Sequence, residues 1–162
     1  MRVVSDTSPL CYLLLIDQID VLPGLFEKVL IPEAVAEELS HPAADRRIRD
    51  WIVTPPAWIG VLEAPKPPSE LNRLDRGESE AISLAVSLKA DLVILDERKA
   101  REAAEVCGLS VTGLLGLLGL ASDRGLVDLP SALVLLQQTS FRADPRLYKL
   151  LLDRSRLRAG SS

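Results

Sequence analysis

The sequence contains few cysteines, histidines and aromatic residues, and these shortages exclude several kinds of protein. Its 162 residues include two cysteines, one histidine and 4% aromatic residues. Cys11 and Cys107 lie far apart in apolar stretches, so neither a disulfide framework nor a paired-cysteine zinc site is indicated. We expect both to be buried. The longest run without charge, residues 106–122, is interrupted by glycine, serine and threonine, which argues against a membrane span.

The sequence also lacks the short motifs of several common activities. It has no GxxxxGK phosphate loop followed by Ser or Thr, no GxGxxG after its first expected strand, and no HExxH metal motif. Arg2 is followed at once by a strand-like run rather than by an apolar leader segment. We therefore expect a cytoplasmic protein with no membrane partner.

The overall composition is typical of one soluble globular domain, because 48% of the residues are hydrophobic and 26% are charged. A chain of this length buries about 70% of its unfolded surface on folding. We therefore expect a single domain over residues 1–162. Short β-branched runs alternate with longer stretches of helical periodicity, which is the pattern of an α/β fold.

The apolar pattern places the expected elements along the chain. Strands are predicted at residues 2–6, 28–31, 91–95 and 109–112, with an edge strand at 59–62. Helices are predicted at 8–16, 33–40, 45–51, 77–89 and 97–106, and again from the glycines at 113, 116 and 119 to residue 158. Residues 54–68 hold five of the eleven prolines and are expected to be irregular. The glycine spacing predicts a smooth helix ridge for close packing.

The charge is concentrated at one end of the chain. Residues 142–158 contain six basic and two acidic residues, whereas the whole protein has a net charge of -4. A basic helical end beginning at about residue 142 could guide a polyanion toward carboxylates in the acidic body. The same end could equally be a solvated terminal helix.

Two aspartates follow apolar strands, at the positions where α/β proteins place their ligands. Asp6 follows the first predicted strand, and Asp96 follows DLVIL, whose apolar run is typical of a central parallel strand. In an open parallel sheet the ligand crevice lies beyond the carboxyl ends of the strands. Either residue alone could be only a helix N-cap, but two in equivalent places favour a site.

Two glutamates fall on the apolar faces of predicted helices. At 100° per residue, Glu38 lies between Ala34 and Val35, whereas Glu37 lies on the wet side. In the helix at 77–89, Glu78 falls near the centre of the apolar face. Glu80 lies at its margin. A carboxylate on a buried face is unfavourable unless it is paired, hydrogen-bonded or bound to a cation.

These four acids, Asp6, Glu38, Glu78 and Asp96, form a plausible ring of oxygen ligands for Mg²⁺ or Mn²⁺. Carboxylates this close repel one another strongly without a cation or raised pKa values. The ring therefore points to metal-assisted phosphodiester hydrolysis. The single histidine, His41, is expected to have a structural role, because the helix before Pro42 should end there.

The sequence around these acids resembles PIN-domain proteins, and is similar to the VapC-type toxins. The matching strings are VVSDTSPL, IPEAVAEEL, RGESEAISLA and DLVILDERKAREAAEVCGLSVTG, in that order over residues 3–113. The resemblance implies a three-layer α/β/α sandwich with a central parallel sheet. It also implies a Mg²⁺- or Mn²⁺-dependent ribonuclease whose catalytic and metal-binding residues are the four acids. An RNA substrate, an antitoxin protein and a homodimer are the partners that it implies.

The resemblance leaves the third acid open between Glu78 and Glu80. We favour Glu78 on its inward helix face and its spacing to Asp96. Many relatives carry a further aspartate after the fourth acid, where this chain has Glu97, so a second metal site could be weaker here. Thr7 or Ser8 could supply a hydroxyl to the site, and Arg101 could contact phosphate. Alternatively, Thr7 or Ser8 could cap a helix, and Arg101 could form a surface ion pair.

Two other functions fit the same residues. The first is a PIN-fold module that binds RNA or a protein partner with weak or no catalysis. The second is a phosphatase or receiver domain with Asp6 as nucleophile, which is less favoured because the strand at 109–112 is followed by no lysine that could meet a phosphate.

Overall fold

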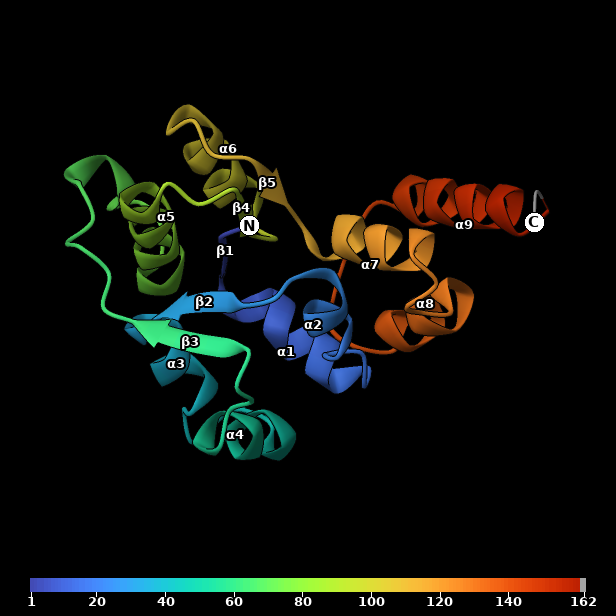
Figure 1. The fold of residues 1–162 in the computed structure, drawn as a ribbon, viewed down its shortest axis with the longest axis horizontal. Helices are drawn as coiled ribbons and strands as arrows, with labels where there is room; N and C mark the ends of the chain where they lie inside the picture. Colours follow the sequence, from blue (N-terminus) through green and yellow to red (C-terminus); the bar gives the residue numbers. More distant parts are fainter. Residues whose placement is uncertain (161–162) are drawn as a thin grey trace.

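A parallel sheet organises the chain (Figure 1). The computed structural model describes residues 1–160. Within them, five strands pair in the order β3-β2-β1-β4-β5, and every pairing is parallel. Their bounds are β1 Val3–Ser5, β2 Val29–Pro32, β3 Ile59–Leu62, β4 Leu92–Ile94 and β5 Val111–Thr112.

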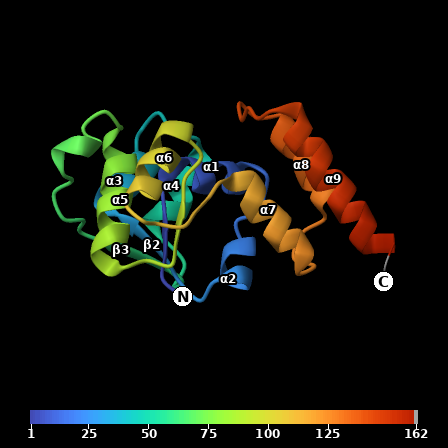
Figure 2. The ribbon, with the colours of Figure 1, turned by 90° about the horizontal axis from the view of Figure 1, so that it is seen from above.

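Helices cover both faces of the sheet, so the fold has three α/β/α layers (Figure 2). The helices are α1 Thr7–Leu15, α2 Val21–Leu25, α3 Glu33–Leu39, α4 Arg46–Val53, α5 Arg76–Leu88, α6 Arg98–Val106, α7 Leu114–Asp123, α8 Leu129–Gln137 and α9 Pro145–Gly160, with a 3-10 turn η1 at Ser69–Leu71. Helices α5 and α6 contribute to the core on one face. The core on the other face takes its side chains from α1 to α4 and from α7 to α9.

Alternation along the central strands creates these two cores. Val3 and Ile94 point into the core beneath α1 and α7. Val4 and Val93 point into the core beneath α5 and α6. All four are fully buried, as expected when successive side chains of a parallel strand face opposite sides of a covered sheet. The uninterrupted apolar character of these strands therefore reflects burial on both faces.

The strand order reverses between β1 and β4. From β1 the chain adds β2 and β3 on one side, whereas β4 and β5 extend the sheet on the other. Such a junction is where open α/β sheets hold their ligands, beyond the carboxyl ends of the strands. Ser5 pairs with Ile94 at this end of the two strands. The residues that follow, beginning with Asp6, therefore emerge side by side.

The predicted α/β organisation and all five strands are confirmed, with ends that differ by one or two residues. Helix α2 was not expected, because its sequence VLPGL contains both Pro and Gly. It forms because Val21 and Leu22 are buried in the core. The expectation of two buried cysteines is wrong: Cys107 is exposed at the end of α6, and Cys11 is half-buried.

The C-terminal helices lie to one side of the sheet (Figures 1 and 2). A Cβ at Gly119 would lie 3.0 Å from Leu151 Cδ2, so the predicted small-residue packing brings α7 close to α9 at this point. Asp123 at the end of α7 accepts ion pairs from Arg154 at 2.6 Å and Arg158 at 3.1 Å. The basic end is thus helical from Pro145, and part of its charge is held by Asp123. Within residues 1–160, no helix is both long and apolar enough to cross a membrane.

Candidate functional site

Asp6 lies at the carboxyl end of β1, where the strand order reverses. Its backbone N–H donates to Ile94 O of β4 at 3.0 Å, which fixes the end of β1 against β4. The residue occupies the N-cap position of α1, yet its side chain makes no capping hydrogen bond to the described residues. Capping therefore does not account for this carboxylate.

The Asp6 carboxylate is held in an unfavourable environment. Asp6 is only 5% exposed, and its Oδ1 has no hydrogen-bond partner among residues 1–160. Burial raises the pKa of Asp6 to about 7, and repulsion from Asp75, Glu38 and Asp96 adds to this effect. A bond from the backbone of Thr7 opposes the rise. Such a group is stabilised by a proton or by a cation.

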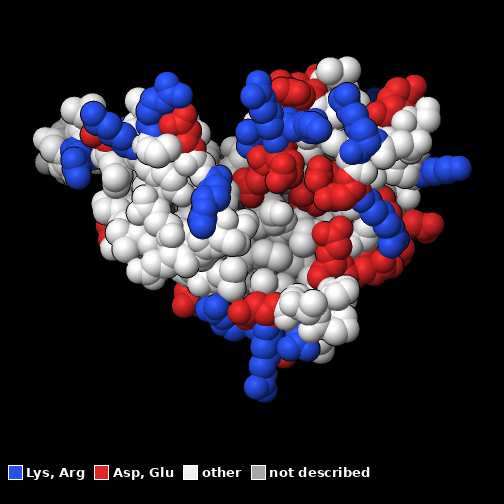
Figure 3. Space-filling view, turned by 180° about the vertical axis from the view of Figure 1, so that it is seen from behind, with Lys and Arg blue, Asp and Glu red and all other residues white. Residues whose placement is uncertain are grey.

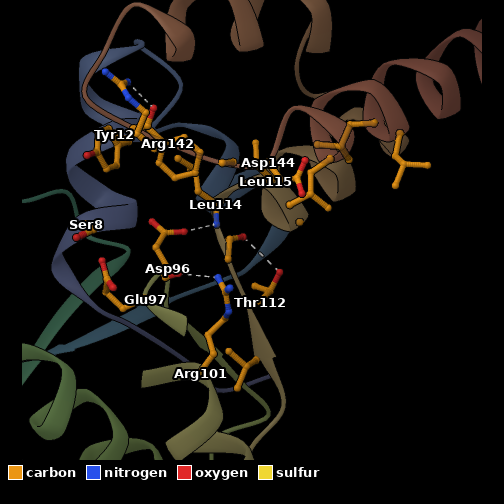
Figure 4. A pocket seen from close by; sticks show the side chains of 18 of the residues that line it. Ser8, Tyr12, Asp96, Glu97, Arg101, Thr112, Leu114, Leu115, Arg142 and Asp144 are labelled. Carbon is orange, nitrogen blue, oxygen red and sulfur yellow. Dashed lines mark hydrogen bonds between the residues drawn. The ribbon is translucent and has the colours of Figure 1, made fainter. Parts of the chain in front are cut away.

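Asp96 follows β4 and serves two purposes (Figure 4). Its Oδ1 accepts a hydrogen bond of 2.8 Å from the backbone N–H of Leu114, at the beginning of α7. Its Oδ2 is buried and has no partner in the part of the chain that the structure describes. Burial raises the pKa of Asp96, whereas this backbone bond and the charge of Arg101 lower it. Asp96 is therefore both a cap for α7 and a source of one free carboxylate oxygen.

Arg101 holds the end of β4 rather than pointing into solvent. Its Nη1 donates to the backbone carbonyl of Asp96 at 2.7 Å. A Cβ at Gly113 would come within 3.1 Å of the same Nη1 and 3.3 Å of Asp96 Oδ1. The side chain of Arg101 is therefore half-buried beside the candidate site, where its charge offsets that of Asp96.

Glu38 reaches the site from α3 across a glycine of α5. A Cβ at Gly77 would lie 2.3 Å from Glu38 Oε1 and 3.1 Å from Asp6 Oδ1, so both carboxylates border the space that this glycine leaves open. Glu38 is exposed, which corrects our expectation that it lies on a buried face. The helix wheel placed it on the correct side of α3, but it lies at the rim. Burial of part of the side chain still raises its pKa, and the neighbouring hydroxyl of Thr7 lowers it.

Glu78 is buried at the beginning of α5, as its helix face predicts. It is 7% exposed, and its pKa is raised to about 8 by burial and by a side-chain hydrogen bond to Asp75 that favours the protonated form. The charges of Asp75, Asp6 and Glu97 raise it further. Glu78 therefore retains a proton near neutral pH in the absence of a cation.

Asp75 is a member of the acid group that our sequence reasoning missed. Its Oδ1 caps α5 by accepting from the backbone N–H of Glu78 at 2.8 Å. Its charge also raises the pKa values of Asp6, Glu38 and Glu78. An Asp three residues before an inward Glu, at the start of a periodic segment, is the capping pattern that could have identified it.

Glu80 lies apart from these acids and joins two helices. Its Oε2 accepts from Arg76 Nε at 2.8 Å, and its Oε1 accepts from the backbone N–H of Ala34 at 3.4 Å. Arg76 also forms an ion pair with Glu37 of α3. Arg76 and its two glutamates thus tie α3 to α5, which holds Glu38 beside Gly77. This arrangement favours Glu78 over Glu80 as the third acid.

The site opens into a cleft of about 890 Å³ between the sheet edge and the C-terminal region (Figure 4). Asp96 and Glu97 line it together with Ser8 of α1 and Arg101 of α6. Acidic side chains also gather in one patch on the face seen in Figure 3, with basic side chains beside them. His41 lies elsewhere and accepts a hydrogen bond from the backbone of Ala43, which agrees with its expected structural role.

The acids are neighbours without forming a closed cage. Among residues 1–160, no three His, Cys, Asp or Glu side chains are arranged around a common point as metal ligands. Instead, Asp6, Glu38, Glu78, Asp96 and Asp75 influence one another through their charges. Asp6 Oδ1 and Asp96 Oδ2 are buried carboxylate oxygens of the site that no described residue binds.

Comparison with known proteins gives one family and one solved structure. A family described as PIN domain matches residues 2–156. The chain is also similar to the structure of a PilT N-terminus domain protein from the hyperthermophilic archaeon Sulfolobus solfataricus P2, with a TM-score of 0.56 and 19% identity. That match covers 75% of this chain and 93% of the other. Comparison with curated proteins returns no match.

We predict that Gly77→Ala displaces Glu38 without unfolding the protein. The new Cβ would overlap Glu38 Oε1, which is the movable end of a side chain, and alanine itself favours a helix by up to about 1 kcal/mol. The carboxyl carbon of Glu38 should therefore shift in NMR spectra while the melting temperature changes little. Gly116→Ala, a helical glycine that meets Thr112 instead, is the matched control. An unmoved Glu38 signal in Gly77→Ala would contradict the contact.

We also predict that the metal-free protein loses stability as the pH rises. The raised pKa values of Asp6, to about 7, and Glu78, to about 8, mean that the folded state keeps protons that the unfolded state releases near pH 4. Their stabilising effect is complete below about pH 4 and is lost as the pH rises through these values. One unit of pKa difference is about 1.4 kcal/mol, and 1 kcal/mol shifts the melting temperature by roughly 2–4 °C.

The melting temperature in a chelating buffer should therefore fall by at least about 4 °C between pH 5.5 and pH 8.5. Asp6→Asn should remove part of this difference, because the amide does not titrate. A melting temperature that is constant or rises over this range in the wild-type protein would show that folding does not raise the pKa values of these two carboxyl groups.

Proposed function

This chain belongs to the PIN-domain family, and on that premise we propose that it is a metal-dependent ribonuclease that hydrolyses RNA phosphodiester bonds. PIN domains are generally nucleases, so the fold is of a nuclease type. The observation that supports activity in this chain is the pair of buried carboxylates, Asp6 and Asp96, each with one oxygen that no described residue binds. They lie where the strand order reverses.

The chemistry of the site's oxygen donors suits a divalent cation, and two of these oxygens have no partner among the described residues. Asp6, Glu38, Glu78 and Asp96 offer hard oxygen donors, which Mg²⁺ and Mn²⁺ prefer. Gly77 leaves open the space that a Cβ would fill between Glu38 and Asp6. When bound, such a cation lowers the pKa of water and offsets the charge that develops on a phosphate in hydrolysis. Asp6 and Asp96 are the residues that would hold it most directly.

The remaining groups position these ligands and hold protons. Arg101 and the backbone N–H of Leu114 fix the orientation of Asp96. Asp75 holds Glu78 through the helix cap, and burial together with the charge of Asp75 raises the pKa of the Glu78 carboxyl. Glu78 can therefore hold a proton while no cation is bound, and it would release this proton on binding one, because metal ligands must be deprotonated. Ser8 and Glu97 line the cleft that a substrate would enter.

We further propose that the protein is the toxin of a toxin–antitoxin pair in the cytoplasm and acts as a homodimer. The observation that supports a protein partner is a set of exposed apolar side chains on α8 and α9. Its members are Val134, Leu135, Leu147, Leu150 and Leu157. Single exposed apolar residues are ordinary, but a group of them on neighbouring helices indicates an interaction surface.

A second function has its own supporting observation. The acids of residues 1–160 do not converge on one point as metal ligands, which is the arrangement expected of a PIN-fold module that binds RNA or a protein with little catalysis. The two functions differ in whether purified protein cleaves RNA when Mn²⁺ is added. Membership of the PIN family leaves the phosphatase or receiver reading without support.

We predict that Asp6→Asn and Asp96→Asn each reduce Mn²⁺-dependent RNA cleavage by more than about 100-fold, because the groups that merely orient metal ligands already contribute about 10- to 100-fold. Asparagine at 96 keeps an oxygen for the Leu114 N–H, so α7 should remain capped. Circular dichroism should show an unchanged fold, and the metal-free melting temperature of Asp6→Asn should not fall. Cleavage by purified Asp6→Asn at the wild-type rate would refute the enzyme assignment.

We predict a graded effect for three neighbouring glutamates. Glu78→Gln should reduce cleavage by at least about 10-fold through loss of a metal ligand or of a group that positions one. Glu80→Gln should have an intermediate effect, because it weakens the contact of α5 with Arg76 and α3. Glu37→Gln is the matched control and should be nearly silent, because the Glu37–Arg76 ion pair is exposed and such pairs contribute little, and the amide oxygen of glutamine can still accept from Arg76. An inactive Glu80→Gln beside an active Glu78→Gln would reverse our choice of the third acid.

A further inference from the structure

The cleft beside Asp96 has a second wall that the acid site does not explain. One wall carries Asp96 and Glu97, and the opposite wall is built from residues 140–144 and the first turns of α9. A nucleic-acid strand with a phosphate at Asp96 could place its next nucleotide in this space. The chemistry of the second wall therefore bears on what lies next to the reacting phosphate.

The second wall presents an aromatic ring held in a defined place. Phe141 lines the cleft and is only partly buried. Its ring lies edge-to-face with Tyr12 of α1, with centroids 5.2 Å apart and planes at 73°. The hydroxyl of Tyr12 is 3.0 Å from Ser140 Oγ, which anchors the segment just before Phe141. Because the ring is fixed before any ligand arrives, binding against it costs little conformational entropy.

The floor and the size of the cleft suit a flat organic group. Leu115 of α7 and Leu151 of α9 contribute apolar surface. The volume of about 890 Å³ falls within the range of about 300–1,000 Å³ that is usual for small-molecule sites. A nucleobase with its sugar is well within this size. The cleft is thus neither a narrow slot for an ion nor a flat protein surface.

Basic groups stand at both sides of this apolar floor. Arg101 lines the cleft from α6, and Arg142 lines it from the second wall. The guanidinium of Arg142 donates to the carbonyls of Thr139 at 3.1 Å and Phe141 at 3.0 Å, so it is preorganised. Arg154, which also lines the cleft, is paired with Asp123 and contributes less. An aromatic ring with flanking arginines is the combination that binds single-stranded nucleic acid through base stacking and phosphate contacts.

We propose that this cleft is a nucleobase subsite for single-stranded RNA, in which Phe141 stacks on the base adjacent to the phosphate held at Asp96 and Arg142 contacts the next phosphate. The proposal rests on the proposed ribonuclease function. It goes further by assigning a binding role to residues 141 and 142, outside the acid group.

The test uses binding of an oligoribonucleotide by the full-length Asp6→Asn protein, which should not cleave it. Asp6 does not line the cleft, so the subsite remains intact. Single 2-aminopurine bases, placed at successive positions of the RNA, report stacking by loss of fluorescence. Adding Phe141→Leu should raise Kd about 5- to 100-fold and abolish the quenching, since stacking on an aromatic ring contributes about 1–3 kcal/mol per base. Phe141→Trp should restore both.

Val53→Ala removes an exposed apolar side chain of α4, which lies outside this cleft, and is the control, with an expected unchanged Kd. If Phe141→Leu melts early, Arg142→Gln supplies the second variant and should weaken binding and reduce its salt dependence. An unchanged Kd in both variants, or RNA that binds without quenching at any position, would overturn the subsite. Absence of RNA binding by the Asp6→Asn parent would overturn it as well.

The outcomes also separate this proposal from the ribonuclease itself. If the single variant Phe141→Leu cleaves RNA as fast as the wild-type protein, the ribonuclease function stands and the subsite proposal fails. If the wild-type protein does not cleave RNA but its RNA binding depends on Phe141 as described, the subsite proposal stands and the protein is an RNA-binding module.

Discussion

The burial of carboxylates where β1 and β4 end is the constraint on which the rest of this structure depends. Asp6 is almost completely enclosed, and its pKa is raised to about 7 chiefly by that burial. Desolvated charge of this kind destabilises a fold unless a proton or cation compensates it. The protein tolerates it at the strand-order reversal, where the two apolar cores on either face of the sheet provide the stability.

The helices around the acids are fixed by contacts that leave the site's own oxygens available. Asp75 caps α5, and Arg76 links α5 to α3 through Glu37 and Glu80. Glu38 and Glu78 are thereby held at the site, while Asp75, Glu37 and Glu80 make the structural contacts. Asp96 combines both roles, with one oxygen on the Leu114 N–H and the other free of any described partner. The division explains why neighbouring acids of similar chemistry differ in their proposed roles.

The C-terminal region completes the other side of the cleft. Gly119 allows α9 to approach α7, and Asp123 holds Arg154 and Arg158. These contacts place Phe141 and Arg142 opposite Asp96. The basic charge that the sequence concentrates after residue 142 is thus used partly to dock α9, so Arg142 is better placed than Arg154 or Arg158 to meet a ligand.

The amino-acid sequence is sufficient to predict the parallel α/β organisation, the positions of Asp6 and Asp96 after their strands, and the inward face of Glu78. These follow from periodicity, because a strand buried on both faces must be apolar throughout and a helix repeats every 3.6 residues. Contacts between distant parts of the chain account for the rest: α2 forms despite Pro23 and Gly24, Glu38 lies at the rim, Asp75 joins the acids, and Phe141 lines the same cleft as Asp96. The reason is physical: burial, repulsion between charges and cleft geometry depend on residues far apart in the chain, which local patterns do not record.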